Sequence, residues 1–216
     1  MVILIIWVPI LWGLGAAAVV SGISVLCWGA MGEKESVPPV NGKKLAILGM
    51  DQSGKTLYFH FLQGKEYFKQ QTEIDEIGPF TYKKSDGTTT KIKKSIDIGG
   101  SYRFAPRYKE LMNNSDCVIF MFDISKYFKD DEYRRDVHSR LEYICNKKES
   151  QGIANCNFKI FATHADLLDC NELNEAKTMF ENNIKNKPYK DILNCAIFRI
   201  NLLNKDEVKE ITDKIL

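Results

Sequence analysis

Short apolar runs alternate with amphipathic segments along the chain after residue 43. The continuous apolar runs predict buried strands at 44–48, 117–122, 158–162 and 196–200. The segments with helical periodicity or high charge density predict helices at 55–64, 131–148, 172–184 and 205–216. Strands that alternate with helices in this way predict an α/β fold, in which a mostly parallel sheet has helices on both faces.

The region between residues 80 and 98 has a different pattern. Two strand-like runs, 80–84 and 90–98, flank the turn sequence Ser85-Asp86-Gly87. Because Asp-Gly favours a tight reversal of the chain, this pattern predicts a β-hairpin.

The first 31 residues are uncharged and largely apolar, and the first charged side chain is Glu33. A helix over 9–30 would span roughly 33 Å at about 1.5 Å per residue, enough for a hydrocarbon core of about 30 Å. A cleaved signal peptide is the alternative, but it would have a basic start and a shorter apolar core. We therefore expect a transmembrane anchor at 1–31, a linker at 32–42 and one globular domain at 43–216.

Basic residues flank only the C-terminal end of this apolar segment, at Lys34, Lys43 and Lys44. The positive-inside tendency then places the globular domain in the cytosol, as expected for a single-pass membrane protein. The net charge of +2 indicates no direct binding to nucleic acid. The six cysteines have no metal-site spacing and fit a reducing compartment.

The apolar run at 44–48 leads into a glycine-rich sequence that fits the phosphate-binding pattern G-x-x-x-x-G-K-[ST]. The residues expected to contact phosphate are Gly49, Asp51, Gln52, Ser53, Gly54, Lys55, Thr56 and Leu57. A strand, a glycine-rich turn and a helix in this order present backbone N–H groups to phosphate oxygens. Lys55 would reach the outer phosphates, and the Thr56 hydroxyl would ligate Mg²⁺.

A second motif, Asp97-Ile98-Gly99-Gly100, follows the run that ends near residue 98. A carboxylate at the end of a strand beside a phosphate loop can hold Mg²⁺, so Asp97 is the second expected metal ligand. Glycine at position 100 would let backbone N–H groups approach the terminal phosphate of a nucleotide.

These two motifs, followed by Thr163-His164-Ala165-Asp166, have the order and spacing of the small GTPases. The sequences Gly49-Met50-Asp51 and Asp97-Ile98-Gly99-Gly100 look most like the Arf/Sar branch. The resemblance covers about residues 43–216 and implies a P-loop small G-protein fold that binds GTP or GDP with Mg²⁺. An Arf-like domain behind an uncleaved N-terminal anchor is similar in layout to the beta subunits of the signal recognition particle receptor.

The resemblance also implies the residues that contact guanine. Asp166 would accept hydrogen bonds from the ring and select GTP over ATP, with Thr163 and His164 beside it. His164 departs from the usual lysine, which packs over the base and braces the phosphate loop. Asn201 and Leu202 stand where the family has its last guanine-contacting loop, although the usual small residues are absent.

Two further departures concern hydrolysis and the metal. Ser101 replaces the glutamine that orients the attacking water, so we expect slow or absent unassisted GTP hydrolysis. In the first switch loop, roughly 66–79, Thr72 is the candidate for closing the Mg²⁺ shell, and Asp75 is a weaker alternative. Arg103 and Arg107 lie near Ser101, but surface or partner-facing roles fit them better than a built-in arginine finger.

The resemblance implies a membrane-anchored GTP-binding protein that holds a cytosolic partner, the receptor alpha subunit, at the endoplasmic reticulum. There it would help to dock ribosomes that carry secretory chains. Two alternatives stay open: an Arf-like switch in vesicle traffic on another membrane, and an adaptor that no longer depends on nucleotide.

Overall fold

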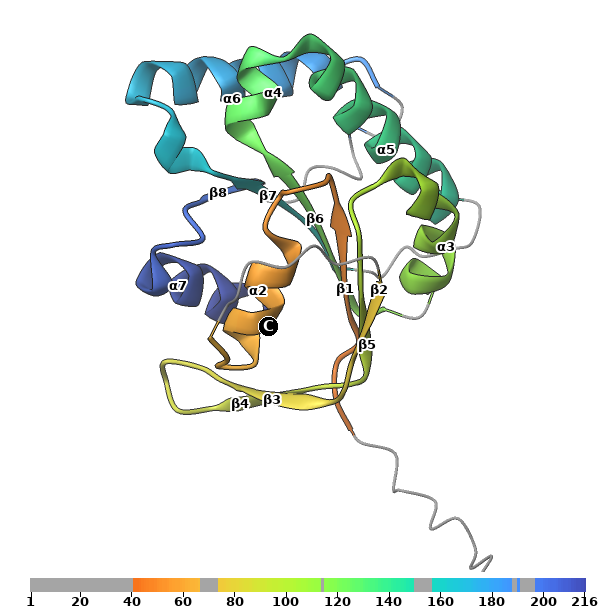
Figure 1. The fold of residues 1–216 in the computed structure, drawn as a ribbon, viewed down its shortest axis with the longest axis vertical. Coiled ribbons are helices and arrows are strands. Elements are labelled where there is room, and N and C mark those ends of the chain that lie inside the picture. Colours follow the sequence, from red (N-terminus) through yellow and green to blue (C-terminus); the bar gives the residue numbers. More distant parts are fainter. Residues whose placement is uncertain (1–40, 67–73, 114, 150–156, 188–189, 191–196) are drawn as a thin grey trace, which may run out of the picture. The chain divides into compact units, whose positions relative to one another are not determined.

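A computed structural model describes residues 41–66, 74–113, 115–149, 157–187, 190 and 197–216 (Figure 1). The predicted anchor at 1–31 lies outside these residues, as does the predicted linker except for its last two positions. Among the helices in the described ranges, none combines the length and the apolar character that crossing a bilayer requires.

In the described part of the chain, six strands form the main sheet in the order β2-β5-β1-β6-β7-β8. The central strand β1 (Leu45–Gly49) lies between β5 (Ser95–Ile98) and β6 (Cys117–Asp123). The outer strands are β2 (Ile74–Ile77), β7 (Asn157–Thr163) and β8 (Ile197–Ile200). All neighbours pair in parallel except β2, which is antiparallel to β5. The prediction of a mostly parallel sheet is therefore confirmed.

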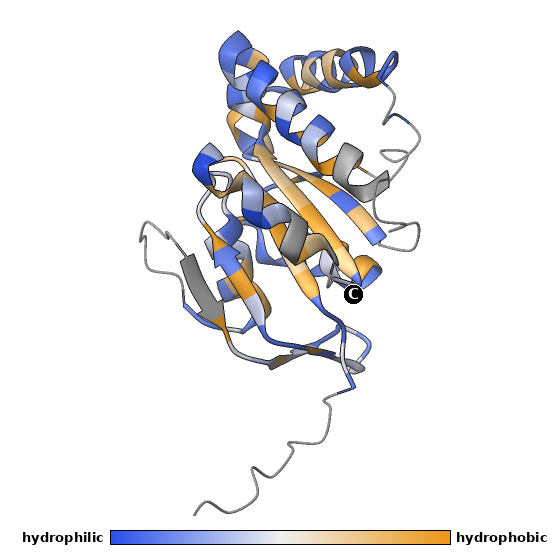
Figure 2. Ribbon diagram, turned by 90° about the vertical axis from the view of Figure 1, so that its right-hand side faces the viewer, coloured by the Kyte–Doolittle hydropathy of each residue, from blue (hydrophilic) through white to orange (hydrophobic). Residues whose placement is uncertain are grey.

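Helices cover both faces of this sheet, as the alternating pattern predicts (Figure 1). One face packs against α3 (Ala105–Asn113), α4 (Ile124–Lys129), α5 (Asp131–Glu149) and α6 (Cys170–Ile184). The other face packs against α2 (Lys55–Leu62) and α7 (Lys205–Ile215). Leu48 and Phe120 point into the first core and Ile47 and Ile119 into the second, so the strands are apolar along their length (Figure 2).

The hairpin prediction was correct only in part. β3 (Phe80–Lys83) pairs with β4 (Thr89–Ile92) as an antiparallel hairpin, but β5 is a separate strand of the main sheet. Ile92 packs in the core beneath α2 and α7, whereas Ile98 packs in the core on the opposite face. One straight strand would place both side chains on the same face, so the chain must bend between them.

The β3–β4 hairpin is fastened to the C-terminal helix α7 through Asp213. The Tyr82 hydroxyl donates to Asp213 Oδ1 at 2.8 Å, and the Ser85 backbone N–H donates to Asp213 Oδ2 at 2.9 Å. Lys84 Nζ donates to the Asp213 carbonyl oxygen at 3.2 Å. These hydrogen bonds join segments that are about 130 residues apart in the sequence.

Beneath α4 and α6, His138 of α5 lies in an aromatic pocket. Its Nε2 is 2.8 Å from the Tyr127 hydroxyl, and its ring packs on Tyr127 and Phe180. Burial, together with the nearby Lys187 and Arg134, lowers the pKa of His138 to about 4. The folded protein therefore favours the neutral imidazole.

We expect acidification to destabilise the protein through His138. The folded-state pKa lies below the ordinary value of 6.5, so the stabilisation is complete above pH 6.5 and is lost as pH falls toward 4. With allowance for the solvent that still reaches the ring, the loss should be about 2 kcal/mol. Urea unfolding at several pH values measures it. Between pH 6.5 and 4, the slope of the free energy of unfolding against pH should be smaller in His138→Phe than in the unaltered chain. The control His60→Gln should keep the full slope. An unchanged slope in His138→Phe would contradict this assignment.

Candidate nucleotide-binding site

The turn between β1 and α2 has the backbone of a phosphate-binding loop. Gly49 and Gly54 have φ angles of 140° and 85°, and Gln52 between them has a φ of 58°. Glycine adopts such conformations freely, whereas glutamine rarely does. α2 begins at Lys55, directly after Gly54. Bends of this kind at a helix N-terminus are the geometry in which backbone N–H groups bind anions.

Gly100, the second glycine of the Asp97 motif, lies against the phosphate loop. A Cβ atom at Gly100 would be 2.1 Å from the Asp51 backbone nitrogen and 2.2 Å from the Met50 carbonyl carbon. Only glycine allows this approach, so the loop after β5 contacts the phosphate loop directly. The predicted proximity of the two motifs is thus confirmed.

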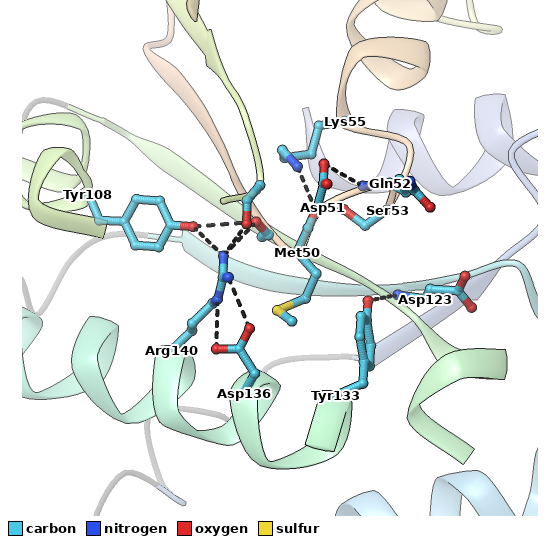
Figure 3. Close-up of polar contacts among 12 residues, drawn as sticks. Met50, Asp51, Gln52, Ser53, Lys55, Tyr108, Asp123, Tyr133, Asp136 and Arg140 are labelled. Carbon is cyan, nitrogen blue, oxygen red and sulfur yellow. Dashed lines mark hydrogen bonds and ion pairs between the residues drawn. The ribbon is translucent and has the colours of Figure 1, made fainter. Parts of the chain in front are cut away.

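Lys55 is buried at the base of the loop, and its Nζ donates to the Met50 carbonyl oxygen at 2.6 Å (Figure 3). The buried Ser53 hydroxyl donates to the same oxygen at 2.8 Å. Burial lowers the pKa of Lys55 to about 8, although the carboxylates of Asp97 and Asp51 oppose this shift. A cation held in a partly dehydrated position is suited to bind a phosphate oxygen strongly.

The two residues expected to hold the metal contact each other. The Thr56 hydroxyl donates to Asp97 Oδ2 at 2.6 Å, and Asp97 is only 2% exposed. A hydroxyl and a carboxylate are hard oxygen ligands of the kind that Mg²⁺ accepts, so the residues present fit this ion. Thr72 lies outside the described residues, and Asp75 lies in β2, opposite Asp97 in the strand register. Leu57, the next residue of α2, is half-buried.

The residues expected on the guanine side follow the carboxyl end of β7. Thr163 ends the strand and donates from its hydroxyl to the Phe122 carbonyl oxygen at 3.0 Å. His164 has a φ of 57°, and its Nδ1 lies 3.0 Å from Thr163 Oγ1 and 3.6 Å from Asp123 Oδ2. Asp166 is exposed in the short helix η2 (Ala165–Leu167), where its carboxylate is accessible to a ligand.

The loop after β8 also reaches the phosphate loop. A Cβ atom at Gly54 would lie 2.2 Å from Leu202 Cδ1, so Leu202 covers this glycine. The Asn201 side-chain oxygen accepts a hydrogen bond from the Leu203 N–H at 2.9 Å, which shapes the turn. Leu202 therefore lies beside the phosphate loop. The guanine contact expected of Asn201 and Leu202 stays a prediction.

Ser101 is exposed and immediately precedes the short helix η1 (Tyr102–Phe104). The guanidinium of Arg103 lies 4.7 Å from the centroid of the Phe104 ring, and Arg107 is exposed on α3. The expected slow hydrolysis stays a prediction, because it concerns a rate.

Sequence reasoning missed Arg140 of α5, which is 4% exposed. Its guanidinium contacts the carbonyl oxygens of Gly49 and Gly100, one from each loop of the site (Figure 3). A signal was present, because Arg140 falls at helical spacing on the inward face with Val137 and Leu141. A charged residue on an apolar helix face indicates a buried polar partner.

Lys126 was also missed. Its Nζ donates to the side-chain oxygen of Gln52 at 3.0 Å and thereby joins α4 to the middle of the phosphate loop. The Lys126 backbone N–H in turn donates to Asp123, the residue beside His164. The hydrogen bond from Lys126 Nζ to Gln52 supports Gln52 in its unfavourable backbone conformation.

Comparison with known proteins extends these observations. The model of the ADP-ribosylation factor family matches residues 37–215. No curated protein matches the chain. The Arl6 BBS3 small GTPase from Trypanosoma brucei, solved with the nucleotide analogue GppNp, has a TM-score of 0.56 and 21% identity, over 81% of this chain and 95% of that one. A bacterial selenocysteine-specific elongation factor, EF-Sec, has a TM-score of 0.56 and 16% identity, over 81% of this chain but only 28% of its own length.

Proposed function

This chain belongs to the ADP-ribosylation factor family of small GTPases, which bind GTP or GDP with Mg²⁺, and we propose that it is a membrane-anchored member that holds a cytosolic protein partner. The finer proposal is a role like that of the signal recognition particle receptor beta subunit. In that role the partner is the receptor alpha subunit, and the membrane is that of the endoplasmic reticulum.

One observation carries the nucleotide-dependent part of this proposal. Lys55, Thr56 and Asp97 surround one point at the carboxyl ends of β1 and β5, where the phosphate loop meets Gly100. Ligands of parallel α/β sheets bind at this edge. The lysine, the hydroxyl and the carboxylate are complementary to a Mg²⁺-bound polyphosphate.

Each part of the site has a distinct task. The backbone of the phosphate loop and Lys55 bind the phosphates, Thr56 and Asp97 hold Mg²⁺, and Asp166 accepts hydrogen bonds from guanine. When bound, Mg²⁺ neutralises charge on the outer phosphates. Ser101 is too short to orient a water as glutamine would, so the GTP-bound state should persist until a partner assists hydrolysis.

The membrane part of the proposal rests on the sequence. The apolar residues 1–31 and the lysines that follow them favour a single-pass protein with its nucleotide site in the cytosol. GTP would order the loops near the terminal phosphate and so create the surface that the partner recognises.

Two other functions compete. An Arf-like switch in vesicle traffic would use the same site on another membrane. An adaptor without nucleotide dependence is favoured by His164 and Ser101, which depart from the residues that the family uses for base packing and hydrolysis. Under that alternative the phosphate loop would be a structural remnant.

The nucleotide that the protein retains distinguishes these functions. The purified full chain is denatured, and the released nucleotide is identified by chromatography. GTP that turns over slowly supports the proposed function, whereas GDP with measurable exchange favours a cycling switch. Neither guanine nucleotide, in a chain that also fails to bind GTP or GDP with Mg²⁺, would favour the adaptor, and ATP would contradict the role of Asp166.

The variant Lys55→Ala gives a second test of the same proposal. Loss of the cation should abolish stable GTP binding and GTP-dependent capture of the partner. In a nucleotide-independent adaptor the same variant would still bind the partner as well as the unaltered chain does.

A further inference from the structure

The guanidinium of Arg140, on α5, connects the phosphate loop to the loop of the Asp97 motif. Its Nη1 donates to the Gly100 carbonyl oxygen, and it lies 3.5 Å from the Gly49 carbonyl oxygen and 3.4 Å from the Tyr108 hydroxyl. Its Nε and Nη2 pair with the two carboxylate oxygens of Asp136 at 3.1 and 3.0 Å. Arg140 therefore contacts the phosphate loop, the Asp97 motif and α3 at once (Figure 3).

This arrangement is held firmly. Burying a guanidinium is costly unless its N–H groups are paired, and here a carboxylate and backbone carbonyls pair them. The Tyr108 hydroxyl also donates to the Gly49 carbonyl oxygen at 3.3 Å, so α3 supports the same point. The planar fork of donors fixes direction as well as distance, which an ammonium group would not do.

The contact with Gly100 determines which way the following peptide faces. In a trans peptide the C=O and the next N–H point in opposite directions. Because the Gly100 carbonyl faces Arg140, the N–H of Ser101 faces away from α5. Arg140 thus sets the orientation of the turn at Gly99–Ser101, the segment expected to contact the terminal phosphate.

We propose that Arg140 is a positioning residue that holds the Gly99–Ser101 turn ready for the terminal phosphate and thereby sets the preference of the site for GTP over GDP. This inference rests on the proposed nucleotide-dependent function. It follows from a difference between the two ligands: GDP lacks the phosphate that this turn would contact. A purely structural role for Arg140 would weaken both nucleotides equally.

Affinities for GDP and for GppNp, each with Mg²⁺, test the proposal in the purified full chain. In Arg140→Gln the affinity for GppNp should fall about tenfold more than the affinity for GDP. Arg140→Lys should recover part of the lost affinity for GppNp, because lysine returns the charge without the planar fork of donors. The control Arg135→Gln alters an exposed arginine of the same helix and should leave both affinities unchanged.

The variant Asp136→Asn provides a second test if Arg140→Gln does not fold. Asp136 is partly exposed, and the asparagine amide would hold the Arg140 guanidinium less firmly than the carboxylate does. The affinity for GppNp should again fall more than the affinity for GDP, but by a smaller factor. Equal losses for both nucleotides, or no loss, in folded variants would overturn the role of Arg140 and leave the proposed function standing. If the unaltered chain binds neither nucleotide, both proposals fail together.

Discussion

Replacing Gly49 with alanine should lower the free energy of unfolding by about 4 kcal/mol or more. A Cβ atom at this position would lie 2.0 Å from the Met121 carbonyl oxygen and 2.7 Å from its backbone nitrogen. Gly49 pairs with Met121 in the β1–β6 ladder at the centre of the sheet, so neither backbone can move without breaking that ladder. The φ of 140° adds backbone strain for any residue with a side chain.

Urea unfolding of the full chain, followed by circular dichroism, measures this loss. Gly87→Ala is the matched control, because Gly87 also has a positive φ, of 85°, but has no atom within 4 Å of an added Cβ. It should cost only about 1 kcal/mol of backbone strain. Similar losses in the two variants would show that the contact with Met121 is not what demands glycine at position 49.

Guanine-nucleotide affinity should fall by roughly tenfold between pH 7 and pH 9 because of Lys55. Burial lowers the pKa of this lysine to about 8, so most of the ligand-free protein has the ammonium at pH 7 and about a tenth has it at pH 9. Phosphate binding requires the ammonium. Above pH 8 the protein must therefore take up a proton when the nucleotide binds.

Calorimetric titration with GDP and Mg²⁺, in two buffers with different heats of ionisation, counts this proton. We expect close to one proton bound per nucleotide at pH 9 and almost none at pH 7. The ionisation of the nucleotide itself is measured separately in the two buffers and subtracted. Proton uptake that stays near zero at pH 9 after this subtraction would show that Lys55 is not the titrating group.

The phosphate loop was predictable because its structure depends on local chemistry. Gly49 and Gly54 permit the positive φ angles, and the apolar run before them defines the strand. The neighbourhood of Asp97 and Thr56 could also be predicted, because parallel strands bring their carboxyl ends to one edge. Spacing along the chain was sufficient for both.

Features that depend on distant packing could not be found in the same way. β2 lies in the segment expected to be a switch loop, and it is a strand because it pairs with β5. The break between β4 and β5 follows from the opposite faces on which Ile92 and Ile98 pack. Arg140 and Lys126 serve the site through tertiary contacts with loops far away in the sequence.

The attachment of the β3–β4 hairpin to Asp213 has a consequence for local opening of the fold. A two-stranded hairpin is marginally stable alone, and this one donates three hydrogen bonds to Asp213 of α7. If the last turn of α7 frays, Tyr82 and Ser85 lose their acceptors at the same moment. Amide protons of the hairpin and of the helix terminus should therefore exchange with solvent through one shared fluctuation, as a single cooperative unit.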